Sequence, residues 1–218
     1  MAREARADPA TLRPFAADYQ GSVEGVGGVG RLSLEKAGHD GRWLIGMRVQ
    51  SQSAVAEVST QTVFDVQGMW LRPLSHNYQK RILLFNSQVD ADFDWSRMEA
   101  RWSGDIASNH KAPVGLQEGD TEPLLVHLAV VMDLAVGRPT TYRDLENGRA
   151  RTAQYQREAE ELVTFNGQTH KALRLSNQDG KTKYTIWVVP GIPCPVRLMQ
   201  QDKGELSIDL RFQEWAWQ

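Results

Sequence analysis

The sequence is poor in the residues that build covalent or metal-bound frameworks. Only one of the 218 residues is a cysteine, Cys194, which excludes an intramolecular disulfide and every metal site that needs several cysteines. The five histidines are far apart and form no H-x-H or H-E-x-x-H pair. No serine lies in a G-x-S-x-G elbow. We therefore assign no catalytic residue, no metal ligand and no cofactor from the sequence.

An excess of one charge and a long apolar run are also missing. The formal net charge is -2 and the basic residues are dispersed, so we expect no nucleic-acid partner. The strongest apolar run, Leu124 to Val136, contains His127 and Asp133 and is much shorter than the roughly 20 residues that span a bilayer. It predicts no transmembrane segment but a buried helix at about residues 121–136, with Thr121 as N-cap and Gly137 as the stop signal.

Turn signals are abundant and lie between segments that alternate apolar and polar residues. Four Asx-Gly dipeptides have the composition of two-residue β-hairpin turns: Asp40-Gly41, Asn147-Gly148, Asn166-Gly167 and Asp179-Gly180. Hairpin blocks on both sides of the apolar helix predict a mostly β fold, in which a single antiparallel sheet curls into a barrel or half-barrel around that helix. We expect a polar N-terminal tail at residues 1–13 and a single domain at residues 14–218.

Two motifs match known ligand loops in letters but not in context. The string from Gly25 to Gly30 has the G-x-G-x-x-G spacing, but the residues after it alternate like a strand, so a hairpin turn is favoured over a dinucleotide site. Asp90, Asp92 and Asp94 are spaced like calcium ligands. The glycine and glutamate that a calcium loop requires further on are absent, which favours a solvated strand or loop.

The seven tryptophans suggest a ligand. Trp43 and Trp187 lie in predicted strands, where aromatic rings line cavities for lipids or stack on sugars. We predict that Trp43, Trp187 and Arg197 lie near a bound ligand. The alternative is that the tryptophans only pack the core and cover the sheet edges.

The order of short motifs resembles a bacterial family, domain of unknown function 3108 (DUF3108). The resemblance runs from about residue 14 to the C-terminus. It rests on Pro14 to Tyr19, Arg72-Pro73, Tyr78, Lys80-Arg81, Phe93-Asp94, Asp120, Gly137, Tyr184 to Trp187, Pro195 to Arg197 and Gly204 to Leu206. It implies an exported protein of the periplasm or cell envelope. The first ten residues lack the apolar core of a secretory signal, so we expect an exported form to have lost its signal peptide.

Three functions remain open at this stage. The first is a non-enzymatic envelope protein that binds a lipid or another amphipathic small molecule inside the curled sheet. The second is a structural module that contacts an envelope protein or a glycan. The third is a hydrolase whose site has no recognisable motif, for instance one that uses Asp94 or His127.

Overall fold

The computed structural model describes residues 12–23, 26–38, 40–52 and 56–218. Within this part of the chain, no helix is both long and apolar enough to cross a membrane. Residues 1–11 of the predicted N-terminal tail lie outside the described residues. The division into a tail and a single domain stays a prediction.

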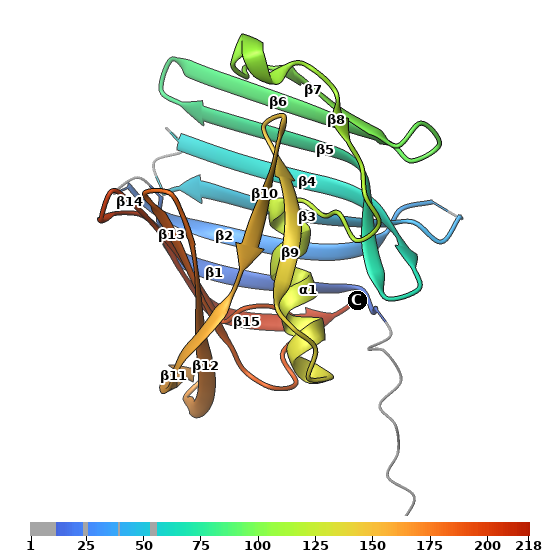
Figure 1. Cartoon of the computed structure of the whole chain (residues 1–218). Coiled ribbons are helices and arrows are strands. Elements are labelled where there is room, and N and C mark those ends of the chain that lie inside the picture. The colour runs from blue at the N-terminus through green and yellow to red at the C-terminus, as the bar shows by residue number, and fades with distance from the viewer. Residues whose placement is uncertain (1–11, 24–25, 39, 53–55) are drawn as a thin grey trace, which may run out of the picture.

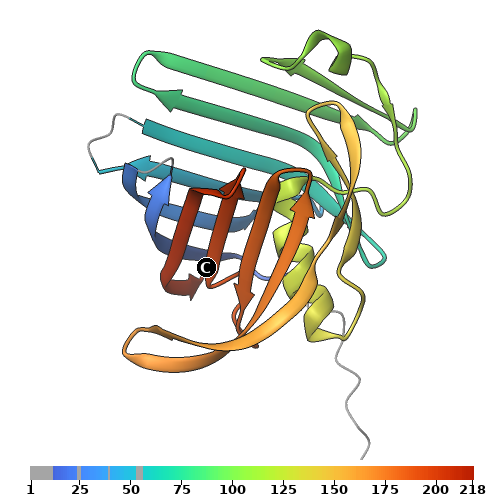
Figure 2. The ribbon, with the colours of Figure 1, turned by 60° about the vertical axis from the view of Figure 1, so that its left-hand side comes forward.

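Thirteen strands form one large sheet, which confirms the predicted mostly β class. Its order is β11-β12-β13-β14-β15-β1-β2-β3-β4-β5-β6-β7-β8, and every pairing is antiparallel. Every pair of neighbours is consecutive along the chain except β15 and β1, whose pairing joins the two ends of the chain. Figures 1 and 2 show that the sheet curls around α1 without closing.

The elements follow one another in simple order. The first half contains β1 (Phe15–Val23), β2 (Val26–Lys36), β3 (Trp43–Ser51), β4 (Ala56–Gln67), β5 (Trp70–Ile82), β6 (Phe85–Asp94), β7 (Glu99–Gly104), the 3-10 turn η1 (Ser108–His110) and β8 (Val114–Gly115). After α1 (Pro123–Ala135) come β9 (Thr141–Glu146), β10 (Arg149–Gln154), β11 (Gln156–Phe165), β12 (Gln168–Asp179), β13 (Thr182–Val188), β14 (Arg197–Asp202) and β15 (Glu205–Trp217).

Glycines allow a close approach of the backbones where the strands from the two ends of the chain pair. Gly21 of β1 pairs with Gly28 of β2, and a Cβ on Gly21 would overlap the carbonyl group of Asp209 on β15. Glycine inside a strand commonly marks such a close approach of two backbones. The predicted hairpin turn over residues 25–30 is therefore wrong for Gly27, Gly28 and Gly30, which lie in β2; Gly25 lies outside the described residues.

The N-cap of the helix lies one residue later in the chain than predicted. Glu122, not Thr121, is the N-cap, because its carboxylate accepts hydrogen bonds from the backbone N–H groups of Leu124 and Leu125 at 3.0 and 2.7 Å. Thr121 instead uses its backbone to bond Arg143 and Leu145 around β9. The predicted stop is confirmed, since Gly137 follows the helix with a φ of 71°.

Two of the four predicted Asx-Gly turns form as expected. Asn147-Gly148 and Asn166-Gly167 have positive φ at both residues, as a type I′ turn requires. The turn predicted at Asp179-Gly180 is shifted by one residue, because Asp179 ends β12 and Gly180 and Lys181 make the turn. Asp40-Gly41 lies in the longer loop between Lys36 and Trp43.

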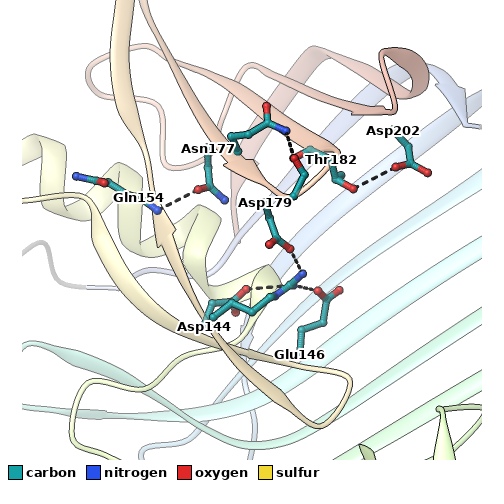
Figure 3. Close-up of polar contacts among 10 residues, drawn as sticks. Asp144, Glu146, Gln154, Asn177, Asp179, Thr182 and Asp202 are labelled. Atoms are coloured by element: carbon teal, nitrogen blue, oxygen red, sulfur yellow. Dashed lines mark hydrogen bonds and ion pairs between the residues drawn. The ribbon is translucent and has the colours of Figure 1, made fainter.

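A separate hairpin, β9–β10, covers one side of α1. Tyr142 and Ala153 of this hairpin pack against Val126 and Val130 of the helix. Polar contacts fasten the hairpin to β12: Arg151 forms an ion pair with Asp179 of that strand, and the side chain of Asn177 accepts a hydrogen bond from the backbone of Gln154 at 3.0 Å (Figure 3). Arg151 also pairs with Asp144 and Glu146 within the hairpin. The hairpin thereby holds the helix inside the curled sheet.

Candidate ligand cavity

A cavity of about 740 Å³ lies between the inner face of the sheet and the first half of α1. Period-two alternation along β3 places Ile45, Met47 and Val49 on one face of the strand, and all three line the cavity. Apolar residues of the helix and the opposite wall complete it, among them Leu124, Leu128, Ile186, Leu198 and Leu210. Small-molecule sites in proteins commonly have volumes of about 300–1,000 Å³ and mostly apolar walls.

A buried polar pair lies at the wall where the helix begins. Nδ1 of His76 on β5 is 3.2 Å from Oε2 of Glu122 and 2.9 Å from Oγ1 of Thr62 on β4. Burial opposes the charged form of Glu122, but His76 and the N–H groups of Leu124 and Leu125 outweigh it and lower the pKa of this carboxyl below its usual value. The pair therefore ties the helix to the sheet and places a carboxylate at the cavity wall.

His127 lies one turn further along the helix and also lines the cavity. The residue is half-buried. Desolvation lowers the pKa of its imidazole to about 4, although the nearby carboxylate of Glu122 acts in the opposite direction. At neutral pH the imidazole is therefore uncharged. It adds a polar but neutral group to the wall of the cavity.

Cys194 is a lining residue with no nucleophilic character. Burial raises the pKa of its thiol to about 12, although a hydrogen bond with Tyr19 opposes the shift. Because the thiolate is the reactive form of cysteine, this side chain acts as a small apolar group at neutral pH.

The lining becomes polar towards solvent. Lys80, Ser87, Arg149 and Gln200 come from β5, β6, β10 and β14, and they are half-buried or exposed, unlike the fully buried Glu122. An apolar interior with a polar, accessible outer part matches a molecule that has one apolar and one polar end.

A solved bacterial structure has a similar fold. The chain is similar to a crystallised β-barrel-like protein of the domain of unknown function DUF1849 from Brucella abortus, with a TM-score of 0.54 and 13% sequence identity. The match covers 95% of this chain and 98% of that one. No family model matches the sequence, and no curated protein matches it. The comparisons therefore support a β-barrel-like fold, a coarser statement than the DUF3108 family.

The structure brings two of the three predicted ligand-binding residues together. Arg197 on β14 lies over the ring of Trp187 on β13, with its guanidinium carbon 4.5 Å from the ring centroid, and it also forms two hydrogen bonds to Asp209. Their strand neighbours Ile186 and Leu198 line the cavity, so alternation places Trp187 and Arg197 on the other face of the sheet.

Trp43, the third of these residues, shares the inner face of β3 with the lining residues but packs against the core beyond the cavity. None of the three is among the residues that line the cavity. Ligand binding by Trp43, Trp187 and Arg197 stays a prediction.

The other sequence candidates lie apart from the cavity or have structural partners. On β6, Asp90 accepts a hydrogen bond from Asn77 and Asp94 accepts one from Ser96. Asp92 lies between these two residues on the same strand. His170 stacks on Phe165, and His39 lies outside the described residues. Among the described residues, no group of three or more His, Cys, Asp or Glu side chains is arranged to hold a metal ion.

Sequence reasoning missed His76 and Glu122. His76 lies in the middle of β5, and only the three-dimensional fold brings it to the helix. Glu122 did leave a signal: an acidic residue directly before Pro123 and an apolar helix is well placed to accept hydrogen bonds from the free N–H groups of the first turn.

Proposed function

We propose that this protein is a non-enzymatic binding protein that holds a lipid or another amphipathic small molecule in its cavity. The observation that carries the proposal is the cavity of about 740 Å³ with apolar inner walls and a polar outer part. An apolar chain that enters it leaves water, which is favourable by roughly 25 cal/mol per Å² of apolar surface buried. The polar end of the molecule would stay near Lys80 and Arg149.

We further propose that the protein is exported and works in the periplasm or cell envelope as a DUF3108-like protein. The support is the ordered set of motifs from Pro14 to Leu206, together with the likeness of fold to a bacterial protein of unknown function. Fractionation of the source bacterium, with detection of the protein in the envelope or cytoplasm, tests this part separately from ligand binding.

A matched pair of substitutions tests the cavity. Val58 and Val63 both lie on β4 and both are half-buried, but Val58 lines the cavity and Val63 does not. Val58→Trp would fill part of the cavity, whereas Val63→Trp adds the same side chain on the opposite face of the strand. Binding of a fluorescent fatty-acid analogue is the measurement, with thermal unfolding to confirm that both variants fold.

We expect Val58→Trp to weaken binding of the analogue by about tenfold or more, because a loss of about 1.4 kcal/mol corresponds to that factor. Val63→Trp should bind like the unmodified protein. Equal binding by the two variants, or no binding by the unmodified protein, would contradict a ligand site in this cavity. Native mass spectrometry of protein purified from its source would then identify the natural ligand.

One observation favours a second function, a hydrolase. Glu122, His76 and His127 line the cavity wall, where a carboxylate and imidazole groups could exchange protons with a bound molecule. Turnover of a panel of ester and amide substrates, abolished by His127→Gln without loss of ligand binding, would support this alternative. Absence of turnover with measurable binding would favour the carrier.

A further inference from the structure

The turn between β5 and β6 exposes three consecutive large apolar side chains. Leu83, Leu84 and Phe85 are 68%, 94% and 79% exposed, and we call them the β5–β6 tip. In Figures 1 and 2 this turn lies at the left-hand end of the sheet, with its two green strands ending there. Contiguous exposed apolar groups on a folded protein commonly mark a contact with a partner or a membrane.

The turn does not need these residues. Ile82 and Phe85 are paired, so Leu83 and Leu84 form a two-residue turn in which Leu83 has a φ of 52°. That conformation favours glycine or asparagine, and this chain uses Asn-Gly at two other hairpins. A leucine here is unfavourable for the turn and exposes apolar surface to water, so its advantage must lie outside the fold.

Positive charge flanks the tip. The segment from Gln79 to Gln88 contains Lys80 and Arg81 and no acidic residue. The acidic residue opposite Arg81 on β4 is Glu57, whose carboxylate forms an ion pair with Arg48 at 2.8 Å. Glu57 is therefore engaged with Arg48, and Arg81 places a positive charge beside the tip, which suits an anionic partner.

The tip also lies at the outer part of the cavity. Lys80 and Ser87 pair across β5 and β6, only two residue pairs from the turn, and both line the cavity. A partner that contacts the tip would therefore lie beside the opening through which a ligand exchanges.

We propose that the β5–β6 tip docks this protein on the surface of an anionic phospholipid bilayer. A convex tip of three side chains offers far less area than the roughly 1,200–2,000 Å² of total surface that a stable protein interface buries. A bilayer needs no matching shape, because its interface accepts leucine and phenylalanine directly and its anionic lipids attract lysine and arginine. The proposal goes beyond ligand binding and does not depend on an occupied cavity.

Flotation with lipid vesicles tests the proposal. Phosphatidylcholine vesicles with and without phosphatidylglycerol are mixed with the protein, and the bound fraction is measured at low and high salt. We expect binding to the anionic vesicles, weakened by salt. Leu84→Asp should lower the vesicle partition coefficient by about tenfold or more, since burial of a leucine side chain accounts for at least that factor.

Three further variants, one of them a control, separate the tip from general surface effects. Leu162 on β11 is 76% exposed, so Leu162→Asp places the same charge on an equally exposed leucine elsewhere and should leave flotation unchanged. Leu83→Gly suits the positive φ and keeps the turn, so it should fold at least as well while it binds vesicles less. Arg81→Glu should weaken binding only to the anionic vesicles, by about fivefold or more.

Several outcomes would overturn the proposal: no flotation of the unmodified protein, or the same loss in Leu162→Asp as in Leu84→Asp. Concentration-dependent dimers that Leu84→Asp abolishes, without vesicle binding, would instead show that the tip meets a second copy of the chain. Val58→Trp separates this proposal from the proposed function, because it should lose the fatty-acid analogue and still float with vesicles.

Discussion

Replacement of Glu122 tests whether one carboxylate holds the helix to the sheet. Its side chain is 1% exposed and interacts with the N–H groups of Leu124 and Leu125 and with His76. Glu122→Ala leaves these buried donors without an acceptor. A buried donor without a partner costs about 1–3 kcal/mol, and the loss of one member of a buried ion pair costs about 3–5 kcal/mol.

We therefore expect Glu122→Ala to lower the free energy of unfolding by about 3–5 kcal/mol. Glu122→Gln keeps an oxygen that accepts from the first turn but loses the charge, so it should lose about 1–2 kcal/mol. The effect of Glu122→Ala is a large part of the roughly 5–15 kcal/mol that stabilises a typical domain.

The same carboxylate predicts a pH dependence. Burial opposes its charge, but His76 and the two backbone N–H groups prevail and lower the pKa in the folded state below the ordinary value of 4.5. A group with a lowered folded pKa stabilises the fold above its unfolded pKa, and this contribution disappears as the pH falls through the folded pKa. The unmodified protein should lose stability below about pH 4.5 more steeply than Glu122→Gln.

Urea unfolding followed by tryptophan fluorescence is the assay, run at neutral pH and in steps down through the acid range. Glu160→Ala is the control, because Glu160 is paired with Lys171 on the surface and its side chain is 58% exposed. Such pairs contribute about 0–1 kcal/mol. The reasoning fails if Glu122→Ala costs no more than Glu160→Ala, or if Glu122→Gln has the same acid sensitivity as the unmodified protein.

Three further predictions concern other buried positions. Burial raises the pKa of the Asp144 carboxyl to about 7, although Arg151 acts in the opposite direction. The stability that the protonated carboxyl contributes is therefore lost as the pH rises from 3.8 through 7. In urea unfolding, Asp144→Asn should lose less stability over this pH range than the unmodified protein. Gly21→Ala should destabilise the protein by more than about 2 kcal/mol in the same assay, whereas Gly27→Ala, whose added Cβ meets no atom within 4 Å, should change stability by less than about 1 kcal/mol. Cys194 should resist iodoacetamide in the folded protein and react after unfolding, and rapid native labelling would contradict its raised pKa.

Local signals were sufficient to predict the class of fold. The alternation of apolar and polar residues predicted a mostly β fold, and Asn147-Gly148 marked a real hairpin. Both follow from residues next to one another in the chain. The pairing of β1 with β15, by contrast, joins opposite ends of the sequence, and no local pattern encodes such a contact.

The candidate site was less accessible to prediction for the same reason. Its walls come from strands in both halves of the chain, and the pair of His76 and Glu122 forms only once β5 lies beside the helix. The number of tryptophans drew attention to Trp187, but its ring lies on the face of the sheet opposite the cavity. A count of aromatic residues carries no information about the face that each one occupies.

The polar contacts of the helix explain how a cavity persists beside it. Glu122 holds the first turn to His76, and Asp133 near the other end accepts a hydrogen bond from Tyr142 at 2.8 Å and pairs with Arg138. Directional contacts at both ends prevent the apolar middle of the helix from sliding into the space. An apolar chain that displaces water from the apolar walls of this cavity is favoured by roughly 25 cal/mol per Å² of apolar surface buried.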